Sequence, residues 1–245
     1  MKLDVLLPLY KPHGNWEKNI IEAITALRSA FEVSADIYLY ITNDGAPEEY
    51  YPAESLQRIS DAVDGKFQFL KYEQNHGKGY SLRHLVKHAD GDYMVYTDGD
   101  FPFGWEAVAQ CFRELINGSD VVMGIRNESY GKALTPFRKC LSSGLRMLNT
   151  LLCGLPARLL DTQAGIKGFN RNGRDSFLRT TVNTFVFDTE FILIAWNRKQ
   201  KITPVPVVLR PGLKLSSMGM KILIQELRCF IKVLWQVRIK KSYQK

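Results

Sequence analysis

Residues 75–100, NHGKGYSLRHLVKHADGDYMVYTDGD, decide the fold, because they place a loop, a helical pattern, a turn and a strand in close succession. The stretch ends in Asp98-Gly99-Asp100, directly after the apolar run 93–96. Residues two apart in an extended segment point to the same side, so the two carboxylates would lie side by side. Carboxylate oxygens suit Mg²⁺ and Mn²⁺, which usually complete their shell with substrate phosphates. Asp98 and Asp100 are therefore the predicted metal ligands.

A glycine-lysine loop precedes this pair of carboxylates. Asn75-His76-Gly77-Lys78-Gly79 stands directly before a helical pattern of Leu82, Leu85 and Val86. Free backbone N–H groups at a helix start, with a lysine beside them, favour an anion. Each motif alone is weak evidence, since Asp-Gly-Asp is also ordinary turn chemistry. In this order they predict a phosphate site beside a metal site, as in an enzyme that handles a nucleotide diphosphate.

The first half of the chain alternates strand-like and helix-like segments. We expect strands at 3–10, 36–41, 66–70 and 93–96, and helices at 20–31, 54–63 and 79–89. Such alternation predicts an α/β fold with a mainly parallel central sheet flanked by helices. Ligands of such sheets bind beyond the carboxyl ends of the strands. Asn43-Asp44-Gly45 and Asp98-Gly99-Asp100 both follow predicted strands, so their positions agree with that rule.

The second half is less regular. We expect helices at 104–117, 137–152 and 187–198, strands at 120–124 and 205–209, and a turn with a short strand at 161–169. No long Pro/Gly-rich linker divides the body, so residues 1–218 are predicted to form one domain, followed by a basic amphipathic helix at 219–245.

Bulk properties narrow the class of protein. Of the 245 residues, 45% are hydrophobic and 24% charged, as in a globular protein. Asp4 and Pro8 interrupt the apolar N-terminus, which therefore does not read as a signal peptide. The four cysteines have no metal-ligand or CxxC spacing, so free thiols in a reducing compartment are expected. A cytoplasmic location is the prediction.

The positive charge is concentrated near the C-terminus. The formal net charge is +8, and residues 221–245 hold seven basic residues against one acidic residue, Glu226. A nucleic-acid binder more often spreads its positive charge over a folded face and carries recognisable reading motifs, and this sequence has none. We therefore expect no nucleic-acid partner.

The same C-terminal segment is amphipathic. Apolar residues recur at helical spacing at Leu223, Leu227, Phe230, Leu234 and Val237. Interspersed charges leave no apolar run of about 20 residues that could span a bilayer. A basic amphipathic helix with Trp235 suits an anionic surface, so peripheral attachment to the cytoplasmic membrane face is one hypothesis. Packing of the stripe on the body, or a dimer seam, is the alternative.

With these motifs the chain resembles glycosyltransferase family 2, whose members have the GT-A fold, and within it the dolichyl- or polyprenyl-phosphate sugar transferases. The resemblance covers about residues 3–217 and rests on several ordered motifs: Leu7-Pro8-Leu9-Tyr10, Asn43-Asp44-Gly45, the loop 75–79 with Arg83, Asp98-Gly99-Asp100, 120–126, 161–169, Phe187-Asp188-Thr189-Glu190 and Arg210-Pro211-Gly212.

The resemblance implies a role for each matching residue. The donor, a UDP- or GDP-linked sugar, would contact Pro8, Tyr10, Asp44, Lys78, Gly79, Arg83 and Asp98. Asp98 and Asp100 would hold Mg²⁺ or Mn²⁺, and Arg126 and Arg210 would offset the charge of the diphosphate. Arg138, Asn149 and Gln163 would bind the acceptor.

The implied reaction is inverting transfer of a hexose to a polyprenyl phosphate, and the alternative acceptor is a hydroxyl of a polysaccharide or glycolipid. A phosphate, with a second pKa of about 6, is largely ionised near neutrality and attacks unaided. A hydroxyl needs a carboxylate base, for which Asp188 and Glu190 are the candidates. Their i, i+2 spacing on a helix predicts that only one faces the site. The alternative for Glu190 is a solvated helix face.

The sequence departs from the family pattern at two places, and two other classes of protein are disfavoured. Pro102 stands where relatives commonly carry a further metal-ligating glutamine, and 213–217 lack the usual serine-lysine. A nucleotidyltransferase is disfavoured, because 8–12 replace the glycine-rich, arginine-containing loop of that class. A non-catalytic scaffold that docks at membranes is the remote alternative, and the intact motifs disfavour it.

Overall fold

The structure is a computed structural model that describes residues 1–31, 34–126, 154–211, 226, 228–233 and 235. The described strands are β1 (Lys2–Leu9), β2 (Asp36–Asp44), β3 (Phe67–Tyr72), β4 (Tyr93–Tyr96), β5 (Val121–Arg126), β6 (Lys167–Asn170) and β7 (Ile202–Val207). The described helices are α1 (Trp16–Phe31), α2 (Ala53–Ala62), α3 (Lys78–His88), α4 (Gly104–Ile116), α7 (Arg171–Leu178) and α8 (Phe187–Asn197), with 3₁₀ turns η1 (Glu48–Tyr50) and η2 (Ala157–Leu159).

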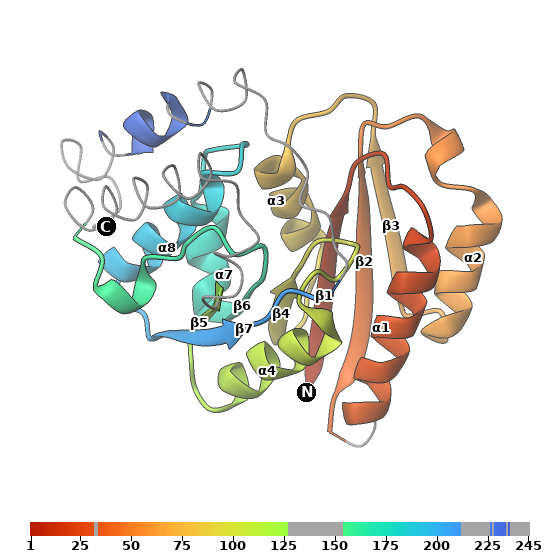
Figure 1. Ribbon diagram of the computed structural model, residues 1–245, viewed down its shortest axis with the longest axis horizontal. Coiled ribbons are helices and arrows are strands. Elements are labelled where there is room, and N and C mark those ends of the chain that lie inside the picture. The colour runs from red at the N-terminus through yellow and green to blue at the C-terminus, as the bar shows by residue number, and fades with distance from the viewer. Residues whose placement is uncertain (32–33, 127–153, 212–225, 227, 234, 236–245) are drawn as a thin grey trace.

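These strands form one sheet in the order β3-β2-β1-β4-β6-β5-β7 (Figure 1). All neighbouring pairs are parallel except those of β6, which runs antiparallel to both β4 and β5. The prediction of a mainly parallel central sheet is thus confirmed. Because β1 to β4 are parallel, their carboxyl ends meet at one edge, and this edge carries the acidic motifs.

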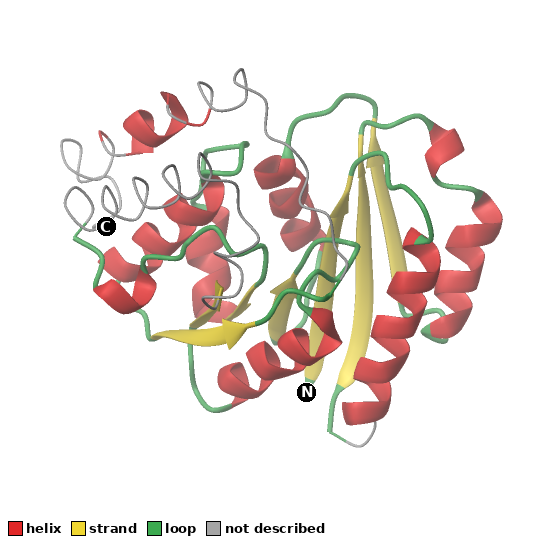
Figure 2. Cartoon of the chain, viewed as in Figure 1, coloured by secondary structure: helices red, strands yellow, loops and turns green. Residues whose placement is uncertain are grey.

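Helices cover both faces of the sheet (Figure 2). Along β1, Leu3, Val5 and Leu7 belong to one hydrophobic cluster and Leu6 to the other, because successive side chains of a strand point to opposite faces. The first cluster joins α1, α2 and α4 to the sheet, and the second joins α3, α7 and α8. Burial on both faces explains why the central strands are almost wholly apolar.

Helix α7 was not predicted from the sequence. Its residues RNGRDSFL include asparagine, glycine and aspartate, which have low helix propensity. Two tertiary features offset that cost: the Asn170 side chain accepts a hydrogen bond from Gly173 N, and Phe177 is fully buried. The Asn170 cap is the signal that could have indicated this helix. The predicted helix at 137–152 lies outside the described residues.

The C-terminal segment is described only in part. Residues 226, 228–233 and 235 are helical, and Phe230 and Val233 are buried in the cluster that contains α3, α7 and α8. At Phe230 the predicted apolar stripe therefore packs on the body, whereas Ile231 and Trp235 are exposed. Within the described part of the chain, no helix has the length and apolar character needed to cross a membrane. The boundary at 218 remains a prediction.

Candidate active site

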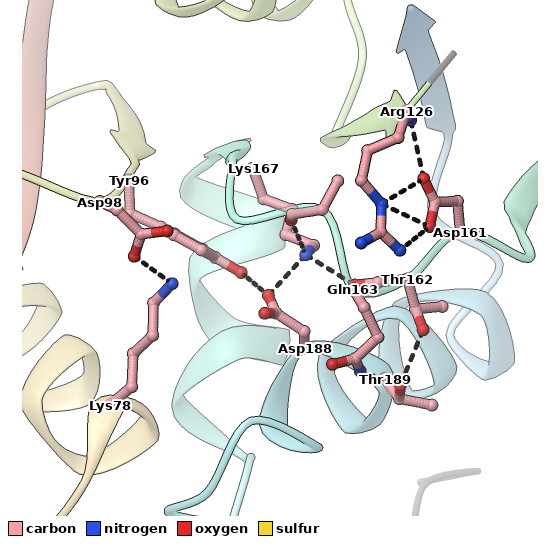
Figure 3. A network of polar contacts seen from close by, with 11 residues as sticks. Lys78, Tyr96, Asp98, Arg126, Asp161, Thr162, Gln163, Lys167, Asp188 and Thr189 are labelled. Atoms are coloured by element: carbon pink, nitrogen blue, oxygen red, sulfur yellow. Dashed lines mark hydrogen bonds and ion pairs between the residues drawn. The ribbon is translucent and has the colours of Figure 1, made fainter. Parts of the chain in front are cut away.

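The two motifs that decide the fold meet at the carboxyl edge of the sheet. Lys78 opens α3, Asp98 follows β4, and the lysine Nζ lies 2.5 Å from Oδ1 of Asp98 (Figure 3). Burial alone would lower the pKa of Lys78, but the charges of Asp98, Asp188 and Asp100 outweigh it and raise that pKa. Lys78 therefore stays cationic beside the acidic pair, as a phosphate-binding lysine must.

The acidic pair has the chemistry of a divalent-cation site. Asp100 is exposed as a whole residue, and partial desolvation of its carboxyl, followed by the nearby charge of Asp98, raises its pKa. A cation between the two carboxylates would relieve that repulsion, and their oxygens suit Mg²⁺ or Mn²⁺. No cluster of three or more His, Cys, Asp or Glu residues suited to a metal occurs among the described residues. Water and substrate phosphate would have to complete the shell, which agrees with Pro102 replacing a ligand.

The backbone of Arg210 lies beside the loop that carries Asp98 and Asp100. Its N–H donates to Pro102 O at 2.8 Å, and its Nη1 lies 3.4 Å from Asp100 O. The residue is exposed, so its guanidinium is accessible to a diphosphate bound through a cation at Asp98 and Asp100.

Asp44, at the end of β2, holds the donor loop, which we define as residues 75–79. Its carboxylate accepts hydrogen bonds from Tyr72 Oη at 2.8 Å, His76 N at 2.9 Å and Gly77 N at 3.1 Å. The loop passes so close that a Cβ on Gly45, whose φ is +74°, would lie 2.3 Å from the carbonyl carbon of Gln74. The proposed contact of Asp44 with a base therefore accompanies a structural role.

Two further predicted donor residues lie at the end of β1. Pro8 pairs with Thr42 of β2, and Tyr10 is exposed just beyond the strand. An exposed aromatic ring at this edge can stack on a base, which agrees with the predicted role of Tyr10.

Arg83 and the donor-loop glycines contact a segment that the sequence did not single out, residues 180–186. Arg83 Nη1 donates to Val182 O at 2.8 Å and to Thr180 Oγ1 at 3.2 Å. Gly79 N donates to Asn183 O at 2.8 Å. Arg83 therefore anchors this segment, and burial lowers the pKa of its guanidinium. Because these partners are about 100 positions away along the chain, no local sequence signal could reveal them.

Asp188 belongs to a buried network (Figure 3). Lys167 Nζ lies 2.6 Å from Oδ1 of Asp188 and also donates to Thr162 O and Ala164 O, while Tyr96 Oη donates to the same carboxylate. The side chain of Lys167 is fully buried, and burial lowers its pKa. Lys167 received no role from the sequence, although a lysine within an apolar strand is a signal of buried ion pairing.

Glu190 is also fully buried, so the alternative that it lies on a solvated helix face is wrong. Its carboxylate accepts hydrogen bonds from Thr181 N at 2.8 Å, Thr181 Oγ1 at 2.9 Å and Val182 N at 2.9 Å. The two acids of α8 thus point to different partners, as their spacing predicts. Asp188 faces the network of Lys167 and Tyr96, and Glu190 faces the segment 180–186.

Residues 161–166 connect this network with the acidic loop. Asp161 accepts from Arg126 N at 2.7 Å and from Arg126 Nε at 3.0 Å, which fixes the arginine at the end of β5. Gln163 Nε2 donates to Thr189 Oγ1 at 2.9 Å. At the other end, a Cβ on Gly165 would lie 2.6 Å from Oδ2 of Asp98. The segment therefore reaches from a candidate phosphate-binding arginine to a candidate metal ligand.

Two predicted acceptor residues, Arg138 and Asn149, lie outside the described residues. The other predicted site residues converge on the carboxyl edge and on the adjoining ends of β5, β6 and α8. This is a site that can bind a diphosphate through Lys78, Arg210 and the donor loop, with Asp98 and Asp100 available for a divalent cation.

Comparisons with known proteins agree with this geometry. The family model described as glycosyl transferase family 2 matches residues 4–158. The chain is 28% identical over 178 residues to a dolichyl-phosphate beta-glucosyltransferase of Trichomonas vaginalis, covering 69% of this chain and 51% of that protein. It is 24% identical over 208 residues to a dolichol-phosphate mannosyltransferase of Pyrococcus furiosus, covering 84% and 56%. The chain thus spans little more than half the length of these relatives.

A solved structure shares the fold. Glucosyl-3-phosphoglycerate synthase of Mycobacterium tuberculosis, in complex with Mn²⁺, UDP-glucose and phosphoglyceric acid, superposes with a TM-score of 0.67 at 16% identity. The match covers 96% of this chain and 79% of that one. At this identity the likeness shows the fold alone, so the prediction of a GT-A fold is confirmed.

Proposed function

Because the chain belongs to glycosyl transferase family 2, we propose that it transfers a hexose, with inversion, from a nucleotide-diphosphate sugar to a polyprenyl phosphate. The observation that carries the choice of acceptor is the state of the two acids of α8. Asp188 is ion-paired with Lys167, and Glu190 accepts three hydrogen bonds, so neither is available to take a proton from a hydroxyl. An ionised phosphate oxygen needs no such base.

The donor would lie along the carboxyl ends of β1, β2 and β4. Tyr10 and Asp44 would contact the nucleoside, as the resemblance implies, and the donor loop with Lys78 would bind the diphosphate. Both UDP- and GDP-linked sugars fit these contacts. The complex of the mycobacterial neighbour with UDP-glucose supports a nucleotide sugar as the donor.

Charge compensation is the main catalytic device that these residues offer. A divalent cation held by Asp98 and Asp100 would act as a Lewis acid toward the leaving diphosphate. Lys78 and Arg210 add fixed positive charge at the same place, and preorganised charge of this kind is often the largest catalytic contribution. Lys78 is already aligned, because its Nζ is held by Asp98 and its backbone by α3.

The acceptor phosphate would approach from β5 and β6. Gln163, a predicted acceptor residue, lies there beside α8, and Arg126, predicted to offset the charge of the diphosphate, borders this region with its guanidinium oriented by Asp161. Arg138 and Asn149 remain predicted acceptor residues. The names of the curated relatives, which act on dolichyl phosphate, support a lipid phosphate rather than a saccharide hydroxyl.

A lipid acceptor calls for access to a membrane surface. Arg228, Ile231, Lys232 and Trp235 are exposed on one face of the described C-terminal helix, opposite the buried Phe230 and Val233. We propose that this face, with its two cations, attaches the enzyme peripherally to the anionic cytoplasmic side of a membrane.

The test is incubation with Mg²⁺ or Mn²⁺, radiolabelled UDP- and GDP-sugars and a polyprenyl phosphate, followed by solvent partition, with Asp100→Asn as the control. We expect metal-dependent label in the organic phase and its loss in the variant. Nucleotide release that requires a saccharide acceptor would favour the hydroxyl alternative. Absence of any donor turnover would favour the non-catalytic scaffold.

A further inference from the structure

The segment 180–186, which precedes α8, touches both the donor loop and the C-terminal helix. We call it the bridging segment. Its two sets of contacts involve different residues, 182–183 toward the donor loop and 184–186 toward Glu226. The segment therefore connects an element near the C-terminus with the loop proposed to bind the donor diphosphate.

Toward the donor loop, the contact is direct and allows little clearance. Asn183 O accepts the hydrogen bond of Gly79 N, and Arg83 holds Val182 O. A Cβ on Gly79 would lie 2.4 Å from Val182 O, and one on Gly77 would lie 2.7 Å from Asn183 O. Because Lys78 stands between these two glycines, a displacement of the bridging segment would displace the backbone that carries Lys78.

On its other side, the bridging segment contacts Glu226, whose carboxylate caps the N-terminus of α8. The N-cap residue of α8, Val186, makes no side-chain capping hydrogen bond of its own. Instead, the Glu226 carboxylate accepts from Val186 N at 2.9 Å, from Thr184 Oγ1 at 3.0 Å and from Phe185 N at 3.4 Å. N–H groups at a helix start need partners, and a negative charge there also interacts favourably with the helix dipole. A carboxylate from another helix thus fixes the start of α8.

The position of Glu226 is itself determined by packing. Phe230 and Val233, one and two turns further along, are buried in the cluster that includes α8. Glu226 is partly buried there, and this burial raises the pKa of its carboxyl. The helix therefore holds the carboxylate against the bridging segment rather than leaving it in solvent.

We propose that Glu226 is a positioning residue for donor binding: it holds the bridging segment, and through it the donor loop and Lys78, in the arrangement that binds the donor diphosphate. This inference rests on the proposed nucleotide-sugar site, but not on the identity of the acceptor. Residue 226 lies beyond residues 4–158, which the family model matches. The C-terminal helix then contributes to the active site without touching the donor.

The experiment compares Glu226→Ala and Glu226→Gln with the wild-type full-length chain. Glu54→Gln, an exposed carboxylate on α2, serves as the matched control. Affinities for UDP-glucose and for GDP-mannose, each with Mn²⁺, are measured by isothermal titration calorimetry, and kcat and both KM values follow from transfer assays. Circular dichroism and thermal unfolding verify that each variant is folded.

We expect Glu226→Ala to weaken donor binding and raise donor KM about fivefold to tenfold, which is the size of effect produced by loss of one helix cap. The acceptor KM and the control should stay within twofold of wild type. Glu226→Gln keeps one acceptor oxygen, so its donor affinity and donor KM should lie between those of wild type and Glu226→Ala. This variant tests the proposal if the alanine variant does not fold.

Wild-type donor affinity in both folded Glu226 variants would overturn the proposal, as would an equal rise in the KM of donor and acceptor. Failure of the proposed function has a different signature. If wild type binds a donor but transfers no sugar to polyprenyl phosphate, weakened donor binding in Glu226→Ala still supports the positioning role. If wild type binds neither donor, both proposals are wrong.

Discussion

Gly165→Ala should lower activity with little change in stability. Gly165 lies close to Asp98, but its backbone conformation is one that alanine also adopts. A Cβ there would lie 2.6 Å from Oδ2 of Asp98, 3.5 Å from its Cγ and 3.6 Å from Lys78 Nζ. Gly165 is not among the glycines with positive φ, so alanine fits its backbone conformation. The substitution therefore acts by pushing the Asp98 carboxylate away from its present position.

The size of the effect follows from these distances. Ordinary contact begins at 3.4 Å, so Asp98 must move by about 0.8 Å, and misplacement of a catalytic group by about 1 Å can cost about 100-fold in rate. The stability change is small, because replacing glycine gains roughly 0.4–1 kcal/mol through the unfolded state, which offsets strain at the Lys78–Asp98 pair. We expect kcat/KM to fall about 100-fold while the free energy of unfolding changes by less than about 1 kcal/mol.

The assay is metal-dependent transfer to polyprenyl phosphate at subsaturating donor, beside urea unfolding of the same preparations. Gly65→Ala is the control, since its φ is +73° and nothing lies within 4 Å of its Cβ position. It should lose about 1 kcal/mol of stability and keep kcat/KM. If Gly165→Ala keeps kcat/KM within threefold of wild type, the reasoning about the close approach to Asp98 is wrong.

Two further predictions concern buried charges. Burial raises the pKa of Asp4 to about 6, against the opposing hydrogen bond from Gly91 N, so wild-type stability should decrease as pH rises from about 4 through about 6. Asp4→Asn should remove this decrease, which is worth at most about 3 kcal/mol for a pKa change from 3.8 to about 6, and about 1.4 kcal/mol of it between pH 5 and pH 8. Urea unfolding at pH 5 and pH 8 measures this difference, and equal pH dependence in both proteins would contradict the prediction. Lys167→Met removes the cationic partner of the buried Asp188 carboxylate and should cost about 3–5 kcal/mol in urea unfolding, whereas Lys167→Met with Asp188→Leu should recover most of that loss. A double variant no more stable than the single one would show that the ion pair is not the reason.

Much of the sheet could be predicted from the sequence, because local patterns determine it. Alternating apolar segments gave the parallel strands in order, and the order of the motifs predicted that the phosphate site at Lys78 lies beside the metal site at Asp98. Helix α1 nevertheless begins at Trp16, before the start at 20 that apolar spacing indicated, since its first turn is polar. Boundaries of this kind depend on capping and solvent rather than on the apolar pattern.

The parts of the site that were missed depend on contacts between distant residues. Asp188 was predicted as a candidate base without a partner and Lys167 received no role, because only the antiparallel insertion of β6 between β4 and β5 brings Lys167 into the interior, 2.6 Å from Asp188. The bridging segment has no motif of its own. Its importance comes from Gly79 and Arg83 of α3 and from Glu226 of the C-terminal helix, which approach it from two separate elements.

The most direct test of the central claim is an NMR spectrum of the lipid-extracted product, made from polyprenyl phosphate and a donor sugar labelled with ¹³C at the anomeric carbon. Our account predicts an anomeric carbon coupled to phosphorus, with a configuration opposite to that of the donor. An anomeric carbon without phosphorus coupling, or with the configuration of the donor retained, would contradict inverting transfer to a lipid phosphate.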